Sequence, residues 1–310
     1  MKECRQVASA IRGMKIRGAP LIGVAAAYGL ALTAYHSKAK TKKELTKEIE
    51  ESAGLLKRTR PTAVNLFWAV DRITRKALKI VGTAKAVAKA VIKEANKMAD
   101  EDVKVNRKMG EHGSVLLNDG DVILTHCNAG SLATVGYGTA LGVIRVAWER
   151  GKKVSVIATE TRPKLQGARL TAYELKRDGI PATLITDGMV GYVMQKRLVN
   201  KVIVGADRIV RDAVINKIGT FGIAVLAREH KIPFYVAAPT STFDLAHSAS
   251  EAVIEERNPM EITHFGTQKI APNGVKVLNP AFDITPMRYV AAIICETGVL
   301  TPKDLEIYAK

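Results

Sequence analysis

From residue 113 onward, short runs rich in Val and Ile alternate with longer amphipathic stretches, and this alternation constrains the fold most strongly. The apolar runs cover residues 121–126, 154–159, 181–186, 201–206 and 233–238. Amphipathic helices are expected between them, over residues 131–150, 167–178, 188–197 and 216–231. Strands of about six residues that alternate with such helices are typical of β-α-β units around a parallel sheet. We therefore predict a Rossmann-like α/β domain over residues 113–310.

Residues 1–112 have a different pattern, in which alanine-rich and Lys/Glu-rich segments follow a helical period without strand-like runs. Helices are expected over residues 2–12, 20–36, 42–57, 62–80 and 83–108. Gly and Pro residues separate these segments, as is usual between helices. The predicted fold class is therefore α/β, with a helical N-terminal domain over residues 1–112 before the Rossmann-like parallel sheet domain.

The cysteine content and one apolar segment bear on the compartment. The three cysteines form no C-x-x-C pair, which argues against a disulfide framework or a zinc site and favours a reduced, cytoplasmic location. Residues 19–32 follow a basic stretch and could be the core of a signal peptide, but the run is short for a membrane span of roughly 20 residues. Its small residues suit a tightly packed helix. We predict a chain that is not exported and has no membrane partner.

The net charge of +17 and the isoelectric point near 9.8 leave two interpretations open. One is nucleic-acid binding. The other is a solvated, charge-rich helical surface, which we favour because the excess lies in amphipathic stretches such as 38–58 and 84–108 and no nucleic-acid-binding module is present. A positive field would also attract a phosphorylated substrate.

Polar residues follow every apolar run of the α/β half, at the edge of a parallel sheet where ligands collect. These segments are Cys127-Asn128-Ala129-Gly130-Ser131, Glu160-Thr161-Arg162-Pro163, Asp187-Gly188, Asp207-Arg208 and Pro239-Thr240-Ser241-Thr242. Their convergence predicts the active edge of the sheet.

Two of these residues are candidates for catalysis. Cys127 lies where a strand meets a loop that leads into a helix, a place that stabilises a thiolate. The alternative is an inert buried cysteine, which suits Cys295 in its apolar, helix-like run better. Asp207 ends an apolar strand, where burial favours a general acid or base. The sequence leaves equally open that Asp207 caps a helix or pairs with Arg208.

Basic residues at chain breaks indicate an anion site. Arg17 precedes a helix with Pro20 in its first turn, Arg60 repeats the arrangement, and Lys217 follows Asn216 beside a Gly-Thr turn. The absence of a Walker loop and of G-x-G-x-x-G favours a sugar phosphate over a nucleotide. No metal-ligand spacing is present, so no metal or cofactor is predicted.

Longer strings around these residues resemble the methylthioribose-1-phosphate isomerase family. That family is shared with ribose-1,5-bisphosphate isomerases and, more distantly, with regulatory subunits of the eukaryotic initiation-factor nucleotide exchange factor. The strings are IRGAPLIGVAAAYGLAL (16–32), RPTAVNLFWAVDRI (60–73), THCNAGSLATVGYGTALGVI (125–144), ETRPKLQGARLTAYEL (160–175), GADRI (205–209), NKIGT (216–220), IEERNP (254–259) and NPAFDITP (279–286). Because they follow in order along nearly the whole chain, the resemblance is more specific than any single motif.

The resemblance implies an aldose-ketose isomerase of methionine salvage, acting on a phosphorylated pentose as a homodimer without a cofactor. It assigns catalysis to Cys127 and Asp207. It assigns substrate binding to Arg17, Gly18, Ala19, Arg60, Gln166, Asn216 and Lys217. Ribose-1,5-bisphosphate or 5-deoxyribose-1-phosphate isomerase and a non-enzymatic regulatory subunit remain alternatives; the strings 254–259 and 279–286 favour the methylthioribose branch.

Overall fold

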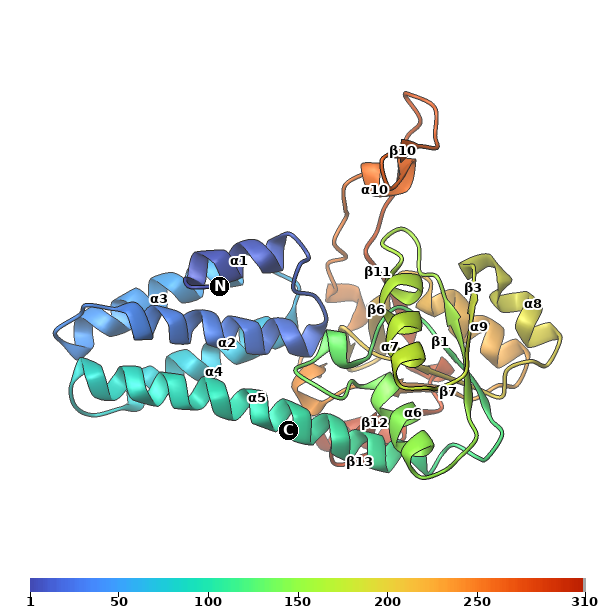
Figure 1. The fold of residues 1–310 in the computed structure, drawn as a ribbon, viewed down its shortest axis with the longest axis horizontal. Helices are drawn as coiled ribbons and strands as arrows, with labels where there is room; N and C mark the ends of the chain where they lie inside the picture. The colour runs from blue at the N-terminus through green and yellow to red at the C-terminus, as the bar shows by residue number, and fades with distance from the viewer. Residues whose placement is uncertain (309–310) are drawn as a thin grey trace.

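The computed structural model describes residues 1–308, and the predicted fold class is confirmed: a helical bundle precedes a mostly parallel sheet (Figure 1). The bundle helices are α1 (Cys4–Arg12), α2 (Ala19–His36), α3 (Lys42–Lys57), α4 (Val64–Lys79) and α5 (Ala84–Ser114). Local chemistry sets their starts. At α3, Thr41 Oγ1 accepts from the Glu44 N–H at 3.2 Å while the Glu44 carboxylate accepts from the Thr41 N–H, a capping box.

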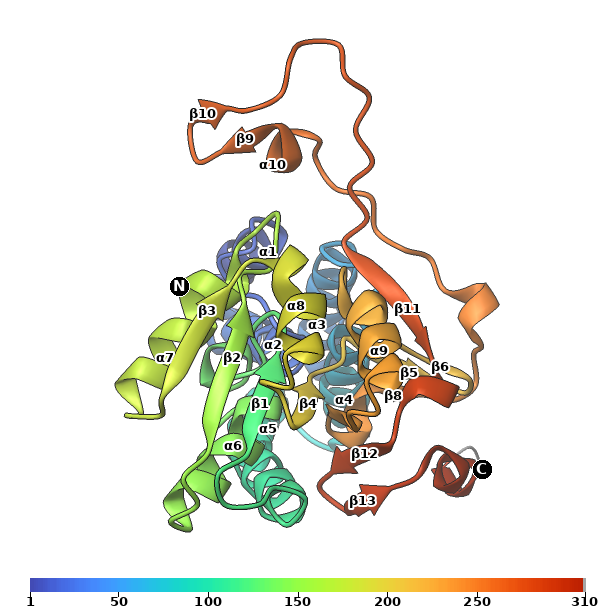
Figure 2. The same cartoon turned by 90° about the vertical axis from the view of Figure 1, so that its right-hand side faces the viewer.

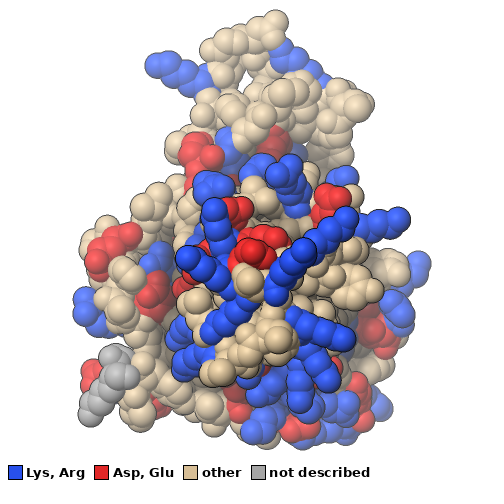
Figure 3. Space-filling view, turned by 90° about the vertical axis from the view of Figure 1, so that its left-hand side faces the viewer, with Lys and Arg blue, Asp and Glu red and all other residues tan. Residues whose placement is uncertain are grey.

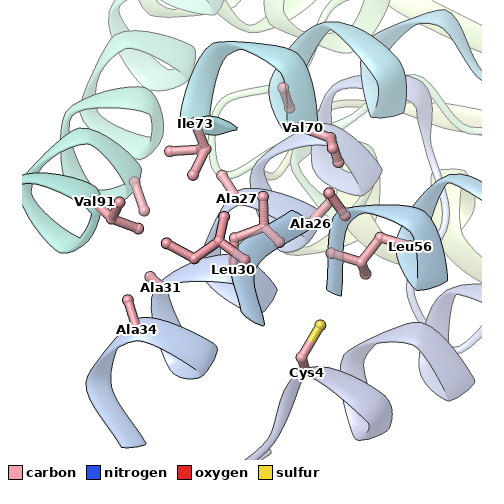
Figure 4. Close-up of a cluster of buried hydrophobic side chains, with 14 of the residues drawn as sticks. Cys4, Ala26, Ala27, Leu30, Ala31, Ala34, Leu56, Val70, Ile73 and Val91 are labelled. Carbon is pink, nitrogen blue, oxygen red and sulfur yellow. The ribbon is translucent and has the colours of Figure 1, made fainter. Parts of the chain in front are cut away.

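Helix α2 is apolar on all sides and forms the centre of the bundle. Its Leu30 lies in one buried cluster with Ile73 of α4 and Val91 of α5 (Figure 4). Among the described residues, α2 is the helix whose length and hydropathy would allow a membrane span. Since α1, α3, α4 and α5 all pack against it, these properties are explained by its place in the core.

The main sheet has the strand order β13-β12-β7-β4-β1-β2-β3, and only its edge strand β13 is antiparallel. The strands are β1 (Val122–Thr125), β2 (Ser155–Thr159), β3 (Ala182–Ile185), β4 (Lys201–Val204), β7 (Phe234–Ala237), β12 (Ala292–Cys295) and β13 (Gly298–Leu300). Strand β1 pairs with both β2 and β4. The chain adds β2 and β3 on one side of β1 and then crosses to add β4 and β7 on the other side. The switch in direction between β1 and β4 is where a sheet of this kind binds ligands.

Helices cover both faces of this sheet (Figures 1 and 2). They are α6 (Ala140–Glu149), α7 (Ala172–Arg177), α8 (Val190–Gln195) and α9 (Thr220–Glu229). The long helix α5 leaves the bundle and packs against α6 and β12, so it belongs structurally to both halves. The predicted domain boundary at residue 112 falls within its last turn and stays a prediction.

A second, smaller sheet follows Asp207 directly, with the order β11-β6-β5-β8. Its strands are β5 (Arg208–Val210), β6 (Ala213–Lys217), β8 (Phe243–Asp244) and β11 (Phe282–Pro286). Because Ile209 pairs with Val214, β5 and β6 are joined by the tight turn at Arg211 and Asp212. The β11 strand pairs antiparallel with β6 and places Asp283 opposite Asn216.

Three expectations about local structure were wrong. The helix expected over 216–231 begins only at Thr220, because the residues before it complete β6. The helix expected over 131–150 begins at Ala140, after a single 3₁₀ turn at Ser131–Ala133. Cys295 ends strand β12 instead of lying in a helix; β12 is buried throughout, so it has no alternation that would mark it as a strand.

Residues 255–281, called the arm below, project from the sheet (Figure 2). The arm contains helix α10 (Met260–Thr263) and the hairpin β9 (His264–Phe265) and β10 (Gln268–Lys269). Two polar contacts and a cation–π contact of Arg162 with the Phe265 ring, 5.7 Å from its centroid, tie it to the loop after β2. Glu261 lies 3.1 Å from the Lys164 ammonium, and the Ile262 carbonyl accepts from the Arg162 guanidinium at 3.0 Å.

The positive charge gathers at the end of the bundle remote from the sheet, where α2 joins α3 and α4 joins α5 (Figures 1 and 3). Exposed lysines there include Lys38, Lys40, Lys43, Lys79 and Lys85. Lys43, Lys79 and Lys85 lie at helix ends, and Lys38 and Lys40 lie on the connector between α2 and α3. The absence of a nucleic-acid partner stays a prediction.

Candidate active site

The structure brings Cys127 and Asp207 to the walls of one pocket at the switch point. Cys127 follows the end of β1, Asp207 follows the end of β4, and these are neighbouring strands. Arg17, Gly18 and Asn216 line the same pocket, a narrow cleft with about 40 Å³ of free space.

Cys127 is held in an unusual backbone conformation. Its φ of 63° lies in the left-handed region, which costs a non-glycine residue roughly 1–3 kcal/mol and concentrates at functional sites. The Cys127 N–H donates to Thr161 Oγ1 at 2.9 Å, and its carbonyl accepts from Thr171 Oγ1 at 2.6 Å. These bonds hold the backbone from which the thiol projects.

Arg17 places a positive charge beside this thiol. One guanidinium nitrogen lies 4.0 Å from the Cys127 sulfur. The guanidinium is oriented by Asn128, whose side-chain and backbone oxygens accept at 2.5 and 2.9 Å. The arginine therefore has a fixed position from which to meet both the sulfur and a bound anion.

A buried carboxylate, Glu174 of α7, organises the loop that carries Cys127. It accepts from Asn128 Nδ2 at 2.9 Å and from the Ser131 N–H and hydroxyl at 2.7 and 2.8 Å. Its charge is balanced by Arg145 at 2.7 Å. Burial acts to raise the pKa of Glu174, but the bonds from Arg145, Asn128 and Ser131 outweigh it and lower the pKa.

Asp207 is buried beside several cationic side chains. Burial raises the pKa of its carboxyl above the usual range, and the positive charges of Lys217, Arg60 and Arg17 oppose but do not cancel this shift. Its backbone N–H donates to the Ile215 carbonyl at 3.0 Å, which anchors it to β6. A carboxyl of raised pKa suits a general acid.

Lys217 lies behind this pair and is buried. Its ammonium donates to the Ala281 carbonyl at 2.7 Å and lies 4.6 Å from the Phe282 ring centroid. Burial lowers the pKa of Lys217, and the neighbouring Cys127 and Asp207, when ionised, counteract the shift. The lysine therefore acts on both proposed catalytic groups electrostatically.

The remaining predicted residues lie in two adjoining spaces. Ala19 and Arg60 line a pocket against Asp207 whose other walls are largely apolar, formed by residues such as Val253 and Phe282. Gln166 lines an outer cavity that also contains Arg17. All nine predicted site residues therefore border one of these spaces or, in the case of Lys217, lie directly behind them; their roles stay predictions.

Gly18 allows the bundle to approach the sheet closely. Its φ is +99°, and an added Cβ would lie 2.4 Å from the Ala133 carbonyl oxygen. Only glycine combines this conformation with this distance. The start of α2 is thereby held against the loop after β1.

Sequence reasoning missed three carboxylates that shape the site. Glu174 and Asp283 act only through tertiary contacts: Asp283 accepts from the backbone N–H groups of Gly219 and Phe221, and no local pattern marks either residue. Glu255, 3.1 Å from Arg60, lies in the string 254–259, which could have indicated it.

His126 is buried, with its ring nitrogens bonded to Thr159 and Ile218. Within residues 1–308, no group of His, Cys, Asp or Glu side chains is arranged to hold a metal ion.

A family model described as the initiation factor 2 subunit family matches residues 15–302. The chain belongs to this family. A relative from Desulforamulus reducens, named methylthioribose-1-phosphate isomerase, is 54% identical over 307 residues, covering 98% of this chain and 89% of the relative.

Solved structures of the family show the same architecture. The 5-methylthioribose 1-phosphate isomerase of Pyrococcus horikoshii has a TM-score of 0.90 and 47% identity, covering 98% of this chain and 87% of that chain. A structure from A. fulgidus, described as translation initiation factor eIF-2B subunit delta, has a TM-score of 0.87 and 54% identity, covering 99% and 90%. Family members at comparable identity therefore carry two kinds of name, an enzyme and an initiation factor.

Proposed function

We propose that this chain is an aldose-ketose isomerase that converts 5-methylthioribose 1-phosphate to 5-methylthioribulose 1-phosphate, a step of methionine salvage. The observation that carries the proposal is the shared pocket of Cys127 and Asp207 with Arg17 beside the sulfur. The name of the relative from D. reducens and that of the P. horikoshii structure support the same reaction.

The chemistry requires ring opening, because a phosphate ester at C1 locks the sugar as a ring without a free aldehyde. Asp207, as the acid, protonates the ring oxygen O4, and the C1–O4 bond breaks. The hydrogen on C2 moves to C1, the O2 proton is released, and C2 becomes the carbonyl carbon. Overall one hydrogen moves from C2 to C1 and one proton from O2 to O4, so no external oxidant or reductant is needed.

The two groups can divide this work. The raised pKa of Asp207 favours its protonated form, the form that ring opening requires. Cys127 assists hydrogen transfer between C2 and C1, either by accepting a proton or by bordering a direct hydride shift. The apolar wall beside Asp207 limits the access of water to the open-chain intermediate.

Product analysis with the purified chain tests the proposal. We expect 5-methylthioribulose 1-phosphate to form from 5-methylthioribose 1-phosphate faster than the corresponding ketose forms from ribose 1,5-bisphosphate or 5-deoxyribose 1-phosphate. In deuterated water, solvent deuterium at C1 supports proton transfer, whereas its absence supports the hydride shift. No turnover of any of the three sugars would reject the enzymatic function.

The second candidate is a regulatory initiation-factor subunit, which the description of the A. fulgidus structure supports. It predicts binding to an initiation factor without isomerase activity, so a pull-down beside the activity assay separates the two functions. We also propose a cytoplasmic location and a homodimer. Size-exclusion chromatography with light scattering measures the oligomeric state.

A further inference from the structure

Charged side chains of alternating sign form a continuous line from the proposed site, through the base of the arm, to the loop after β2. In order they are Arg60, Glu255, Arg257, Glu261 and Lys164. The distances between the charged atoms of successive neighbours are 3.1, 2.8, 2.9 and 3.1 Å. We call this set the charge line. It begins at a wall of the pocket against Asp207 and ends at the outer cavity that Gln166 lines.

The backbone at the base of the arm places two members of the charge line on one side. Glu256 and Pro280 form an antiparallel bridge there, and the Arg257 N–H donates to the Asn279 carbonyl at 2.9 Å. In such an extended ribbon, side chains two residues apart point to the same side. Glu255 and Arg257 therefore face each other's neighbours and not opposite sides of the arm.

Arg257 is the central and most constrained member. Its guanidinium donates to the two carboxylate oxygens of Glu261 at 2.9 and 3.0 Å and to Glu255 at 2.8 Å. Two-pronged bonds of this kind fix the plane of a guanidinium. Burial acts to raise the pKa of Glu261, but the bonds from Arg257 and Lys164 outweigh it and lower the pKa to about 2. Glu261 therefore stays ionised at neutral pH and anchors Arg257.

Arg60 in turn depends on Glu255 for its position. Besides this ion pair, the Arg60 guanidinium contacts the Met14 sulfur at 3.0 Å, and its Nε has no hydrogen-bond partner among residues 1–308. One carboxylate oxygen of Glu255 pairs with Arg60 and the other with Arg257. The Glu255 side chain is 28% exposed, so without Arg257 it would be free to turn towards solvent.

We propose that Arg257 is a positioning residue of the proposed isomerase, which holds Glu255 in place so that Glu255 holds Arg60 at the pocket against Asp207. The inference rests on the proposed function, in which Arg60 binds the substrate. Arg257 itself lies behind Glu255 and is not among the residues that line either pocket around Asp207. Its effect on the reaction therefore passes through Glu255.

Steady-state kinetics with 5-methylthioribose 1-phosphate test the proposal in a double-mutant cycle. We expect Arg257→Gln and Glu255→Gln each to raise KM by roughly three- to tenfold, the scale of coupling through an ionic network, with kcat unchanged. The double variant should be no worse than Glu255→Gln alone. Arg257→Lys keeps the charge but loses the two-pronged geometry, so it recovers part of the loss. Lys276→Gln, an exposed lysine of the arm, is the control and leaves KM unchanged.

The pH dependence of kcat/KM gives a second readout that loss of folded protein would not move. Burial is the main cause of the raised pKa of Asp207, the charge of Glu255 adds to it, and it is opposed by Lys217, Arg60 and Arg17. Removing the Glu255 charge therefore lowers the pKa of Asp207. Because the acid form is lost as pH rises through that pKa, the falling limb of the profile should move to lower pH in Glu255→Gln.

The outcomes separate this inference from the proposed function. With an active wild-type chain, an unchanged KM in Arg257→Gln would overturn the positioning role, and so would a lower kcat alone, which indicates only a less stable arm. Additive losses in the double variant would also overturn it, since Arg257 would then not act through Glu255. If Arg257→Gln does not fold, Arg257→Lys decides in the same way: a raised KM supports the role and an unchanged KM overturns it. A wild-type chain that turns over none of the sugars would instead reject the isomerase function itself.

Discussion

Replacing Glu174 with Gln tests how the catalytic loop is held in place. One carboxylate oxygen accepts from the Ser131 N–H, the Ser131 hydroxyl and Arg145, and the other accepts from Asn128 and the Leu132 N–H. Glutamine keeps only one acceptor oxygen, so its NH₂ group must face at least two buried donors. Each loses a bond whose absence costs about 1–3 kcal/mol, and Arg145 loses one of its two carboxylate partners.

We therefore expect Glu174→Gln to lower the free energy of unfolding by about 3–5 kcal/mol, the usual cost of breaking a buried ion pair. The assay is urea denaturation followed by circular dichroism, with kcat/KM measured in parallel because the displaced loop carries Cys127. Glu149→Gln is the matched control: Glu149 is exposed and bonds the Tyr137 hydroxyl, so its loss stays within about 0.5 kcal/mol. A loss below about 1 kcal/mol for Glu174→Gln would refute this account of the loop.

Two further predictions concern Asp283 and Gly18, which lie beside the site. Burial raises the pKa of Asp283 to about 6. The stability that the protonated carboxyl contributes is therefore present below its ordinary pKa and is lost as pH rises through 6. The stability advantage of wild type over Asp283→Asn should shrink from acidic to neutral pH, and urea midpoints with a constant difference would contradict this. Gly18→Ala should destabilise the chain by at least about 1–3 kcal/mol in urea denaturation, since the new Cβ meets a carbonyl oxygen in a left-handed conformation. Gly222→Ala, in open space on α9, is its control, and equal effects of the two substitutions would refute the packing argument.

The parallel sheet could be predicted from the sequence because each strand is a short Val/Ile run bounded by turn residues. The expected runs 121–126 and 201–206 contain β1 and β4, and the residues that follow them reach one pocket. This success has a physical basis: parallel strands end at a common edge, so sequence position alone places Cys127 near Asp207.

The second sheet could not be predicted in the same way. Strand β6 is short and runs directly into the turn before α9, so its apolar residues fit a helix as well as a strand. Its last residues, Asn216 and Lys217, extend beyond the pairing with β5 and pair with β11, which lies more than sixty positions later. The wrong start of the expected helix 216–231 follows from this long-range pairing.

The carboxylates that support the site could also not be predicted from local sequence patterns. Glu174 lies on α7 with no capping or metal-ligand spacing, and only the folded chain brings it to the loop of Asn128 and Ser131. Glu255 reaches Arg60 only in the folded chain, because the two residues lie far apart in the sequence. The catalytic candidates were identified by strand position, whereas the groups that orient them depend on tertiary structure.

The central claim is that Cys127 and Asp207 act on one sugar phosphate in a shared pocket. Single-turnover kinetics and equilibrium binding of 5-methylthioribose 1-phosphate to Cys127→Ser and Asp207→Asn test it most directly. We predict that each variant binds the sugar phosphate with nearly wild-type affinity and loses at least roughly 100-fold in the chemical step, the scale of lost acid-base catalysis. Full turnover in either variant would contradict the account.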